Sequence, residues 1–166
     1  MAIRRRFHSL RIGQMGKQVN IGASVVFEYP SAISLADAST INRGSVIRAS
    51  ETGRIHIGQR TGVLEYTLIT SNGGNISIGD NSWLGAGSQI YGNGNVSIGN
   101  HVLIAAQVVV NTVSHNYENP EVPINLQGLN VAPVVIEDDV WIGLGAKILQ
   151  GVTVGRGAII RSEEHT

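Results

Sequence analysis

An aliphatic residue followed by Gly recurs along the chain, with a small or β-branched residue four places after the aliphatic one. The repeat is six residues long, and it holds in the hexads that begin at Ile21, Ile57, Ile78, Ile98, Ile136, Ile142 and Val154, with Glu137 as the one departure from Gly. Neither an amphipathic helix nor a β-sandwich has this spacing. A six-residue spacing is typical of short strands that are joined by tight corners and that each point one large side chain inward. The pattern therefore predicts a β-solenoid.

The distances between hexads indicate the shape of one coil. Ile136 and Val154 are 18 residues apart, which is three hexads and so one triangular coil. The steps from Ile57 to Ile78 and from Ile78 to Ile98 are 21 and 20 residues. We expect the additional residues at the Asn-Gly-rich corners 71–75 and 92–95, because Gly and Asn favour turns.

The six-residue rhythm fails between Val110 and Ile136. This stretch contains Pro120 and Pro123, which cannot continue a strand ladder. We expect a loop over about 116–133 that protrudes from one corner of the solenoid, with His115 at its root. Loops of this length in compact domains are usually functional or disordered.

Composition supports strand and turn over helix, because Ile and Val together number 38 against 10 Leu, with 21 Gly and 2 Lys. The 166 residues suit one domain. A net charge of zero with 14% charged and 42% hydrophobic residues argues against a nucleic-acid-binding protein. The absence of Cys excludes disulfides and thiolate metal sites. No apolar run approaches a membrane span, and Arg4–Arg6 lead into no secretory core, so we expect a cytoplasmic protein without membrane insertion.

Two further motifs accompany the hexads: Asp-Asp-Val-Trp-Ile-Gly at 138–143 and Gly-Val-Thr-Val-Gly at 151–155. With them, the chain from about Val19 to Ile160 resembles the hexapeptide-repeat acyltransferases, in particular the branch that acetylates sugars and polysaccharide precursors. The resemblance implies an all-β fold, a left-handed parallel β-helix, which is an exception to the usual right-handed crossover. It divides the chain into a lead-in at 1–18, the β-helix at 19–160 and a tail at 161–166.

The resemblance also implies a reaction. His115, at the root of the loop, corresponds to the family's catalytic base, and acetyl-CoA is the implied co-substrate, without a metal. An imidazole with a pKa near 6.5 is suited to removing a proton from an attacking hydroxyl at neutral pH. The expected attack is direct, with the oxyanion held by a backbone N–H or a hydroxyl. Ser114 or Asn111 are candidates for orienting His115 or the acceptor.

The remaining site residues are implied in the same way. Trp141 resembles the tryptophan beside the family's cofactor groove, and Gly143, Leu144, Gly145 and Ala146 are expected to form a low groove wall for the pantetheine arm. Asn111, Tyr117 and Glu118 are candidates for binding the acceptor. Members of the family are usually homotrimers with sites between subunits, so His115 of one chain is expected to act beside the cofactor groove of the next.

Other functions stay open at this point. Galactoside- and maltose-type relatives place asparagines where this chain has Leu84-Gly85-Ala86-Gly87, so the acceptor is undetermined. An amino-sugar or xenobiotic acetyltransferase and a catalytically silent scaffold are alternatives. A zinc carbonic anhydrase of similar fold needs two histidines five residues apart, and the histidines at 8, 56, 101, 115 and 165 include no such pair.

The last six residues, Arg161 to Thr166, continue neither a hexad nor a cap. They look like the translation of a sequencing adapter. We expect the natural chain to continue with a further coil and a basic segment.

Overall fold

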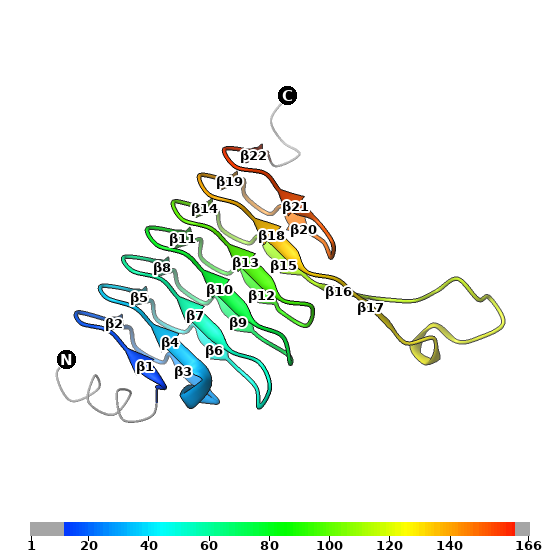
Figure 1. The fold of residues 1–166 in the computed structure, drawn as a ribbon, viewed down its shortest axis with the longest axis horizontal. Coiled ribbons are helices and arrows are strands. Elements are labelled where there is room, and N and C mark those ends of the chain that lie inside the picture. The colour runs from blue at the N-terminus through cyan, green and yellow to red at the C-terminus, as the bar shows by residue number, and fades with distance from the viewer. Residues whose placement is uncertain (1–11, 162–166) are drawn as a thin grey trace.

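The computed structural model describes residues 12–161, and in them short strands wind into a three-sided β-helix (Figure 1). Residues 1–11 of the expected lead-in and 162–166 of the expected tail lie outside the described residues, as do His8 and His165. Stacking of the coils produces three parallel sheets, which we name A, B and C. The expected all-β, left-handed β-helix is confirmed.

Each complete coil contributes one strand to each sheet. Sheet A contains β1 (Gln14–Met15), β4 (Ile33–Leu35), β7 (Ile55–Ile57), β10 (Ile76–Ile78), β13 (Val96–Ile98), β18 (Val134–Ile136) and β21 (Thr153–Val154). Sheet B contains β2 (Asn20–Ile21), β5 (Thr40–Ile41), β8 (Gly62–Val63), β11 (Trp83–Leu84), β14 (Leu103–Ile104), β19 (Trp141–Ile142) and β22 (Ile159–Ile160). Sheet C contains β3 (Val26–Glu28), β6 (Val46–Arg48), β9 (Leu68–Thr70), β12 (Gln89–Tyr91), β15 (Val109–Asn111) and β20 (Lys147–Ile148).

The core runs along the axis of the solenoid and consists of the hexad aliphatic residues. In sheet B, five stacked strands each bury one such side chain: Ile41, Val63, Leu84, Ile104 and Ile142. Sheet A differs from the expectation of one inward residue per strand, because its three-residue strands bury their first and last side chains, as Ile55 and Ile57 do. Side chains alternate along a strand, so only the middle residue of such a strand faces outward.

Small residues fill the corners, as their place in the hexad predicts. At the corner between sheets A and B, Thr61 and Ser82 are buried, and their hydroxyls donate to the Gly79 and Gly99 carbonyl oxygens of the next coil, at 2.6 and 3.0 Å. These bonds satisfy groups whose burial would otherwise cost about 1–3 kcal/mol each. His101 and Asn81 both take a left-handed φ, of 57° and 55° respectively, so His101 occupies a corner position that suits Asn.

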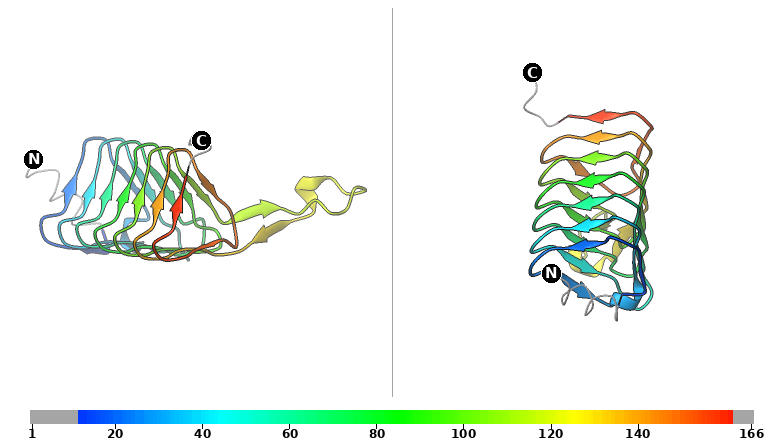
Figure 2. Two further views of the ribbon diagram at one scale, coloured as in Figure 1. Left: turned by 90° about the horizontal axis from the view of Figure 1, so that it is seen from above. Right: turned by 90° about the vertical axis from the view of Figure 1, so that its left-hand side faces the viewer.

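The chain between β15 and β18 leaves the solenoid as an arm (residues 113–131), visible at the right of Figure 1 and at the right of the left-hand view in Figure 2. Its base is not a plain loop, because β16 (Val113–His115) pairs antiparallel with β17 (Leu129–Val131). A short 3-10 turn, η2 (Ile124–Leu126), lies farther out, and a second one, η1 (Pro30–Ala32), follows β3. The described chain contains no helix with the length and apolarity that a membrane span requires.

Candidate active site

The arm is anchored at the corner between sheets C and A. Where β15 ends, the Asn111 side-chain amide donates to the Val113 carbonyl oxygen at 2.9 Å, which fixes the direction in which the chain departs. The buried Thr112 hydroxyl donates to the Tyr91 carbonyl oxygen and accepts from the Gly94 N–H, both at 2.8 Å. The root of the arm is therefore held against the coil that precedes it.

The two faces of the arm point toward opposite ends of the solenoid. On one face, Ser114 Oγ accepts a hydrogen bond of 2.6 Å from Gln150 in the following coil. On the other, Val131 lies so close to Gly94 of the preceding coil that a Cβ on Gly94 would be 2.8 Å from Val131 Cγ1. Side chains alternate along β16, and Val113 is paired with Val131. His115 therefore shares a face with Val131, and that face is turned toward the preceding coils.

The polar side chains at the corners of those preceding coils include Thr52, Asn72 and Asn93, which we name the corner shelf. Thr70 Oγ1 donates to Asn72 Oδ1 at 2.8 Å, and Asn72 Nδ2 donates to Asn93 Oδ1 at 3.2 Å. The side-chain oxygen of Asn93 is thus occupied by the bond from Asn72, which fixes the orientation of the Asn93 amide. The NH₂ group of Asn93 has no hydrogen-bond partner among the described residues. The shelf consequently ends in two free hydrogen-bond donors.

The sequence predicts the corners 71–75 and 92–95 only as places for additional residues. They do form the corners between sheets C and A, directly before the coil that carries the arm. The available signal was the succession of Asn-rich corners ahead of His115. What the sequence did not reveal is that Thr70 and Asn72 orient the Asn93 side chain.

The His115 side chain is exposed and, within residues 12–161, forms no hydrogen bond or ion pair. Neither of its expected orienting neighbours contacts it by a hydrogen bond, because Asn111 bonds to Val113 and Ser114 to Gln150. Tyr117 and Glu118 lie beyond β16, are exposed, and are linked by a bond of 3.1 Å from the Tyr117 N–H to Glu118 Oε2. The imidazole is thus exposed and without a bonding partner among the described residues.

The residues expected to bind the cofactor lie elsewhere on the coil. Trp141 is on the outer face of β19, with 49% of its surface exposed, and Gly143–Ala146 form the corner that leads from sheet B to sheet C. Gly145 has a left-handed φ of 70°, and a Cβ at this position would meet no atom within 4 Å, so this corner is open. Leu144, at the same corner, is exposed.

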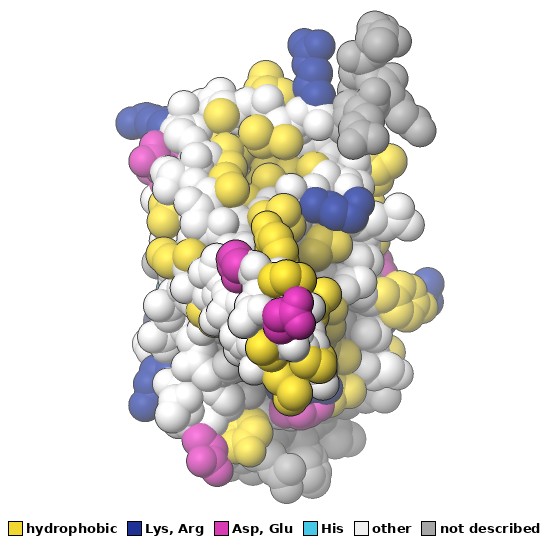
Figure 3. Space-filling model, turned by 90° about the vertical axis from the view of Figure 1, so that its right-hand side faces the viewer, with side chains coloured by type: hydrophobic (Ala, Val, Ile, Leu, Met, Phe, Trp, Pro, Cys, Tyr) yellow, Lys and Arg dark blue, Asp and Glu magenta, His cyan; other side chains and the backbone are white. Residues whose placement is uncertain are grey.

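One chain does not bring His115 and Trp141 together. In a three-sided coil, the corner between sheets C and A lies opposite sheet B, and Figure 1 shows β19 on the far side of the solenoid from the arm. Around Trp141, the outer face of sheet B carries a column of exposed apolar side chains, Trp83, Leu103, Trp141 and Ile159, which we name the apolar stripe. Hydrophobic side chains also cover much of the arm (Figure 3), among them Ile124, Leu126 and Leu129.

Among residues 12–161, no three His, Cys, Asp or Glu side chains are grouped so that they could hold a metal ion. The features that remain are an exposed imidazole, a polar shelf with free amide donors, and, on the opposite side, an indole beside an open glycine corner. An imidazole can exchange a proton with a hydroxyl or an amine that is held against it.

Comparison with known proteins agrees with the fold. The family model described as the hexapeptide repeat of succinyl-transferase matches residues 75–112 and 133–162, on either side of the arm. A solved structure of AntD, an N-acyltransferase from Bacillus cereus in complex with dTDP and 3-hydroxybutyryl-CoA, superimposes with a TM-score of 0.60 over 96% of this chain and 74% of that one, at 16% identity. At that identity the likeness supports the fold alone.

Three curated relatives are similar in sequence. A probable acetyltransferase of Mycobacterium tuberculosis is 31% identical over 77% of this chain and 45% of its own length. A putative acetyltransferase of Saccharomyces cerevisiae is 34% identical over 77% of this chain and 65% of its own. A putative colanic acid biosynthesis acetyltransferase of Escherichia coli is 28% identical over 51% of this chain and 44% of its own. The chain thus spans less than two thirds of each relative. Residues 75–112 and 133–162 thus match the hexapeptide-repeat family model, and the chain is similar in sequence to proteins described as probable or putative acetyltransferases.

Proposed function

We propose that the protein transfers an acetyl group from acetyl-CoA to a hydroxyl of a sugar or surface-glycan precursor, with His115 as the general base. The observation that carries this proposal is the position of His115 on the arm face that is turned toward the corner shelf. A saccharide offers several hydroxyls at once, so one can meet the imidazole while another accepts a hydrogen bond from Asn93. The colanic acid relative supports a glycan acceptor.

In the proposed reaction, the imidazole of His115 removes the proton of the acceptor hydroxyl as its oxygen attacks the thioester carbonyl. The C–S bond then breaks, and the departing thiolate takes the proton back from the imidazolium. The product is an ester and a free thiol. A backbone N–H near the arm stabilises the oxyanion. No covalent intermediate on the protein is needed, in keeping with a site that has no Cys.

The cofactor site is proposed to lie at Trp141, Gly143, Leu144, Gly145 and Ala146, with the pantetheine arm along the open corner and against the indole. CoA in the complex of AntD supports an acyl-CoA donor. We also propose that the acceptor is bound by Asn111, Tyr117 and Glu118. Because His115 and Trp141 lie on opposite sides of one solenoid, a site that uses both combines two chains. We propose a homotrimer in which the exposed apolar surfaces are covered.

The test is an acceptor panel. The protein is incubated with acetyl-CoA and, separately, with methyl glucoside, methyl galactoside, glucosamine and a buffer blank, and release of free thiol is followed. Release that depends on a methyl glycoside supports O-acetylation. If free thiol is released with glucosamine but with neither methyl glycoside, the protein is an amino-sugar N-acetyltransferase and the proposed O-acetylation is wrong. No release above the blank with any acceptor contradicts an acetyltransferase of these substrates and favours the scaffold alternative.

The role of Asn93 has its own test. Asn93→Ala removes a hydrogen-bond donor to the acceptor, so we expect about a tenfold higher KM for the accepted glycoside and an unchanged KM for acetyl-CoA. Asn42→Ala is the matched control, because Asn42 also has its side chain bonded to a single neighbouring side chain, Glu65, at a different corner. Equal effects of the two variants on the glycoside KM would remove Asn93 from the acceptor site.

A further inference from the structure

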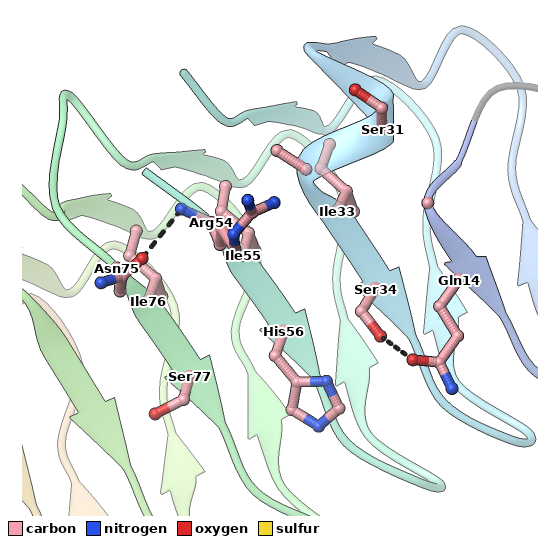
Figure 4. Close-up of a pocket in the computed structure, with 12 residues that line it drawn as sticks. Gln14, Ser31, Ile33, Ser34, Arg54, Ile55, His56, Asn75, Ile76 and Ser77 are labelled. Atoms are coloured by element: carbon pink, nitrogen blue, oxygen red, sulfur yellow. Dashed lines mark hydrogen bonds between the residues drawn. The ribbon is translucent and has the colours of Figure 1, made fainter. Parts of the chain in front are cut away.

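A hollow of about 480 Å³ lies on the outer face of sheet A, and none of the residues that line it belongs to the proposed active site. It extends over four adjacent strands, β1, β4, β7 and β10, and Figure 4 shows the residues that line it. Strands in a sheet are about 4.8 Å apart, so the hollow is about 14 Å long, which exceeds one hexose ring. Its volume is within the usual range of ligand sites.

The floor of the hollow is a row of polar side chains in register. Gln14 pairs with Ser34, Ser34 with His56, and His56 with Ser77. Figure 4 shows the side chains of Ser34 and Ser77 on either side of the imidazole of His56. The Ser34 hydroxyl donates to Gln14 Oε1 at 3.3 Å, which leaves the Gln14 NH₂ group available.

The rim adds a positive charge. Arg54 and Asn75 border the hollow, and the Arg54 backbone N–H donates to Asn75 Oδ1 at 3.1 Å, so the Asn75 NH₂ group is available to a ligand. Within residues 12–161, the Arg54 guanidinium has no ion pair and no hydrogen bond. The described residues that line the hollow include no Asp or Glu. Beside Ala and Ile side chains, the described lining therefore offers hydrogen-bond donors and one cation, and it contains no carboxylate.

A second hollow on the same sheet, of about 310 Å³, provides the comparison. Arg156 lines it together with Glu137 and Asp138, so its positive charge is accompanied by two carboxylates. Two depressions of the same sheet thus differ in charge. Only the first combines an unpaired guanidinium with hydroxyls, amides and an imidazole, a set of groups that binds oxyanions by charge-assisted hydrogen bonds.

We propose that the hollow formed by Gln14, Ser34, Arg54, His56, Asn75 and Ser77 binds a sugar that carries an oxyanion, either a carboxylate or a phosphate. Arg54 binds the anionic group, and the hydroxyl and amide side chains bind the ring hydroxyls. The hollow begins where the corner shelf ends, because Arg54 and Asn75 follow Thr52 and Asn72 in the same two corners. A glycan acceptor that crosses the corner would reach both places, an extension that rests on the proposed function.

The test measures binding without acetyl-CoA, so it does not depend on transfer activity. The isotope-labelled full chain is titrated with sodium glucuronate, glucose 6-phosphate, glucose and inorganic phosphate, and backbone amide shifts are followed by NMR. We expect shifts at Ser34, His56 and Ser77 with glucuronate or glucose 6-phosphate, at an apparent Kd at least tenfold below that of glucose. Whichever acidic sugar binds more tightly identifies the anion as carboxylate or phosphate.

Arg54→Ala should raise that Kd about tenfold, whereas Arg156→Ala, the matched change in the second hollow, should leave it within about twofold. Circular dichroism and melting of each variant check that the solenoid is intact. The inference is overturned if glucose binds as tightly as the acidic sugars, if the shifts lie outside the hollow, or if the two arginine variants behave alike. Inorganic phosphate binding as tightly as glucose 6-phosphate would also overturn it, because the site would then recognise charge without sugar.

Discussion

At the scale of single residues, Trp141 and His115 are both exposed but have different proposed roles. Trp141 lies on β19, whose next residue, Ile142, is buried in the core, whereas His115 is the last residue of β16 in the arm. Because the indole is proposed to cover one wall of the pantetheine groove, Trp141→Ala should raise the KM for acetyl-CoA about tenfold or more and change kcat much less. Leu103→Ala, in the same column of the apolar stripe, is the control for lost apolar surface.

The Trp141 prediction is checked by steady-state kinetics over a range of acetyl-CoA concentrations. If the KM for acetyl-CoA is unchanged while melting shows an intact fold, Trp141 serves only in packing. If Leu103→Ala raises this KM equally, the effect belongs to the stripe and not to the cofactor groove.

At the scale of elements, the position of the arm depends on Gly94. A Cβ at Gly94 would lie 2.8 Å from both Val131 Cγ1 and the Ala132 carbonyl oxygen, so Gly94→Ala must displace the base of β17. Overpacking of this kind costs about 1–3 kcal/mol. We expect kcat to fall by at least tenfold and amide exchange across β16 and β17 to accelerate, while amides of the solenoid stay protected.

Gly155→Ala is the matched control, because a Cβ there would meet no atom within 4 Å. Normal turnover of Gly94→Ala, with unchanged exchange in the arm, would show that contact with Gly94 does not position His115. A uniform loss of protection through the whole solenoid would show a general destabilisation instead of a displaced arm.

The elements also show what the sequence could and could not predict. In each hexad, an aliphatic side chain must face the axis and a small residue must fit a corner. The coils can therefore be predicted from the spacing of residues such as Ile78 and Ser82, which are both buried. The arm has no such repeat. Its antiparallel pairing rests on contacts between Val113 and Val131, which are 18 residues apart and carry no periodic signal. The direction of His115 depends on that pairing, so sequence alone could not predict it.

At the scale of the whole molecule, the separation of His115 from Trp141 makes the proposed site testable by mixing chains. His115→Ala and Trp141→Ala chains are coexpressed and assayed at acetyl-CoA concentrations well below its KM. If each site takes His115 from one chain and Trp141 from the next, random trimers should recover about a quarter of wild-type activity. If both groups act within one chain, the mixture cannot exceed the average of the two variants. A monomer in sedimentation would contradict the trimer directly.

The hollow on sheet A also depends on the stacking of the whole molecule, so the sequence does not predict it. Its lining residues come from four coils, between Gly13 and Ser77, and none belongs to a recognised motif. Individually, His56 and Arg54 resemble ordinary surface residues of a strand and a corner. Only the stacking of the coils aligns them, since residues about 20 positions apart become neighbours. Sequence spacing alone does not show which of these columns is concave or lacks carboxylates.

The most direct test of the proposed function is the turnover of His115→Ala with acetyl-CoA and the glycoside that the acceptor panel identifies. Removal of a general base should lower kcat by roughly 10²–10⁴ and leave the KM for acetyl-CoA within about threefold. His101→Asn, at a corner with a left-handed φ of 57° that Asn tolerates, should retain wild-type turnover. A kcat of His115→Ala within threefold of wild type, with an intact fold, would contradict the assignment of His115 as the base.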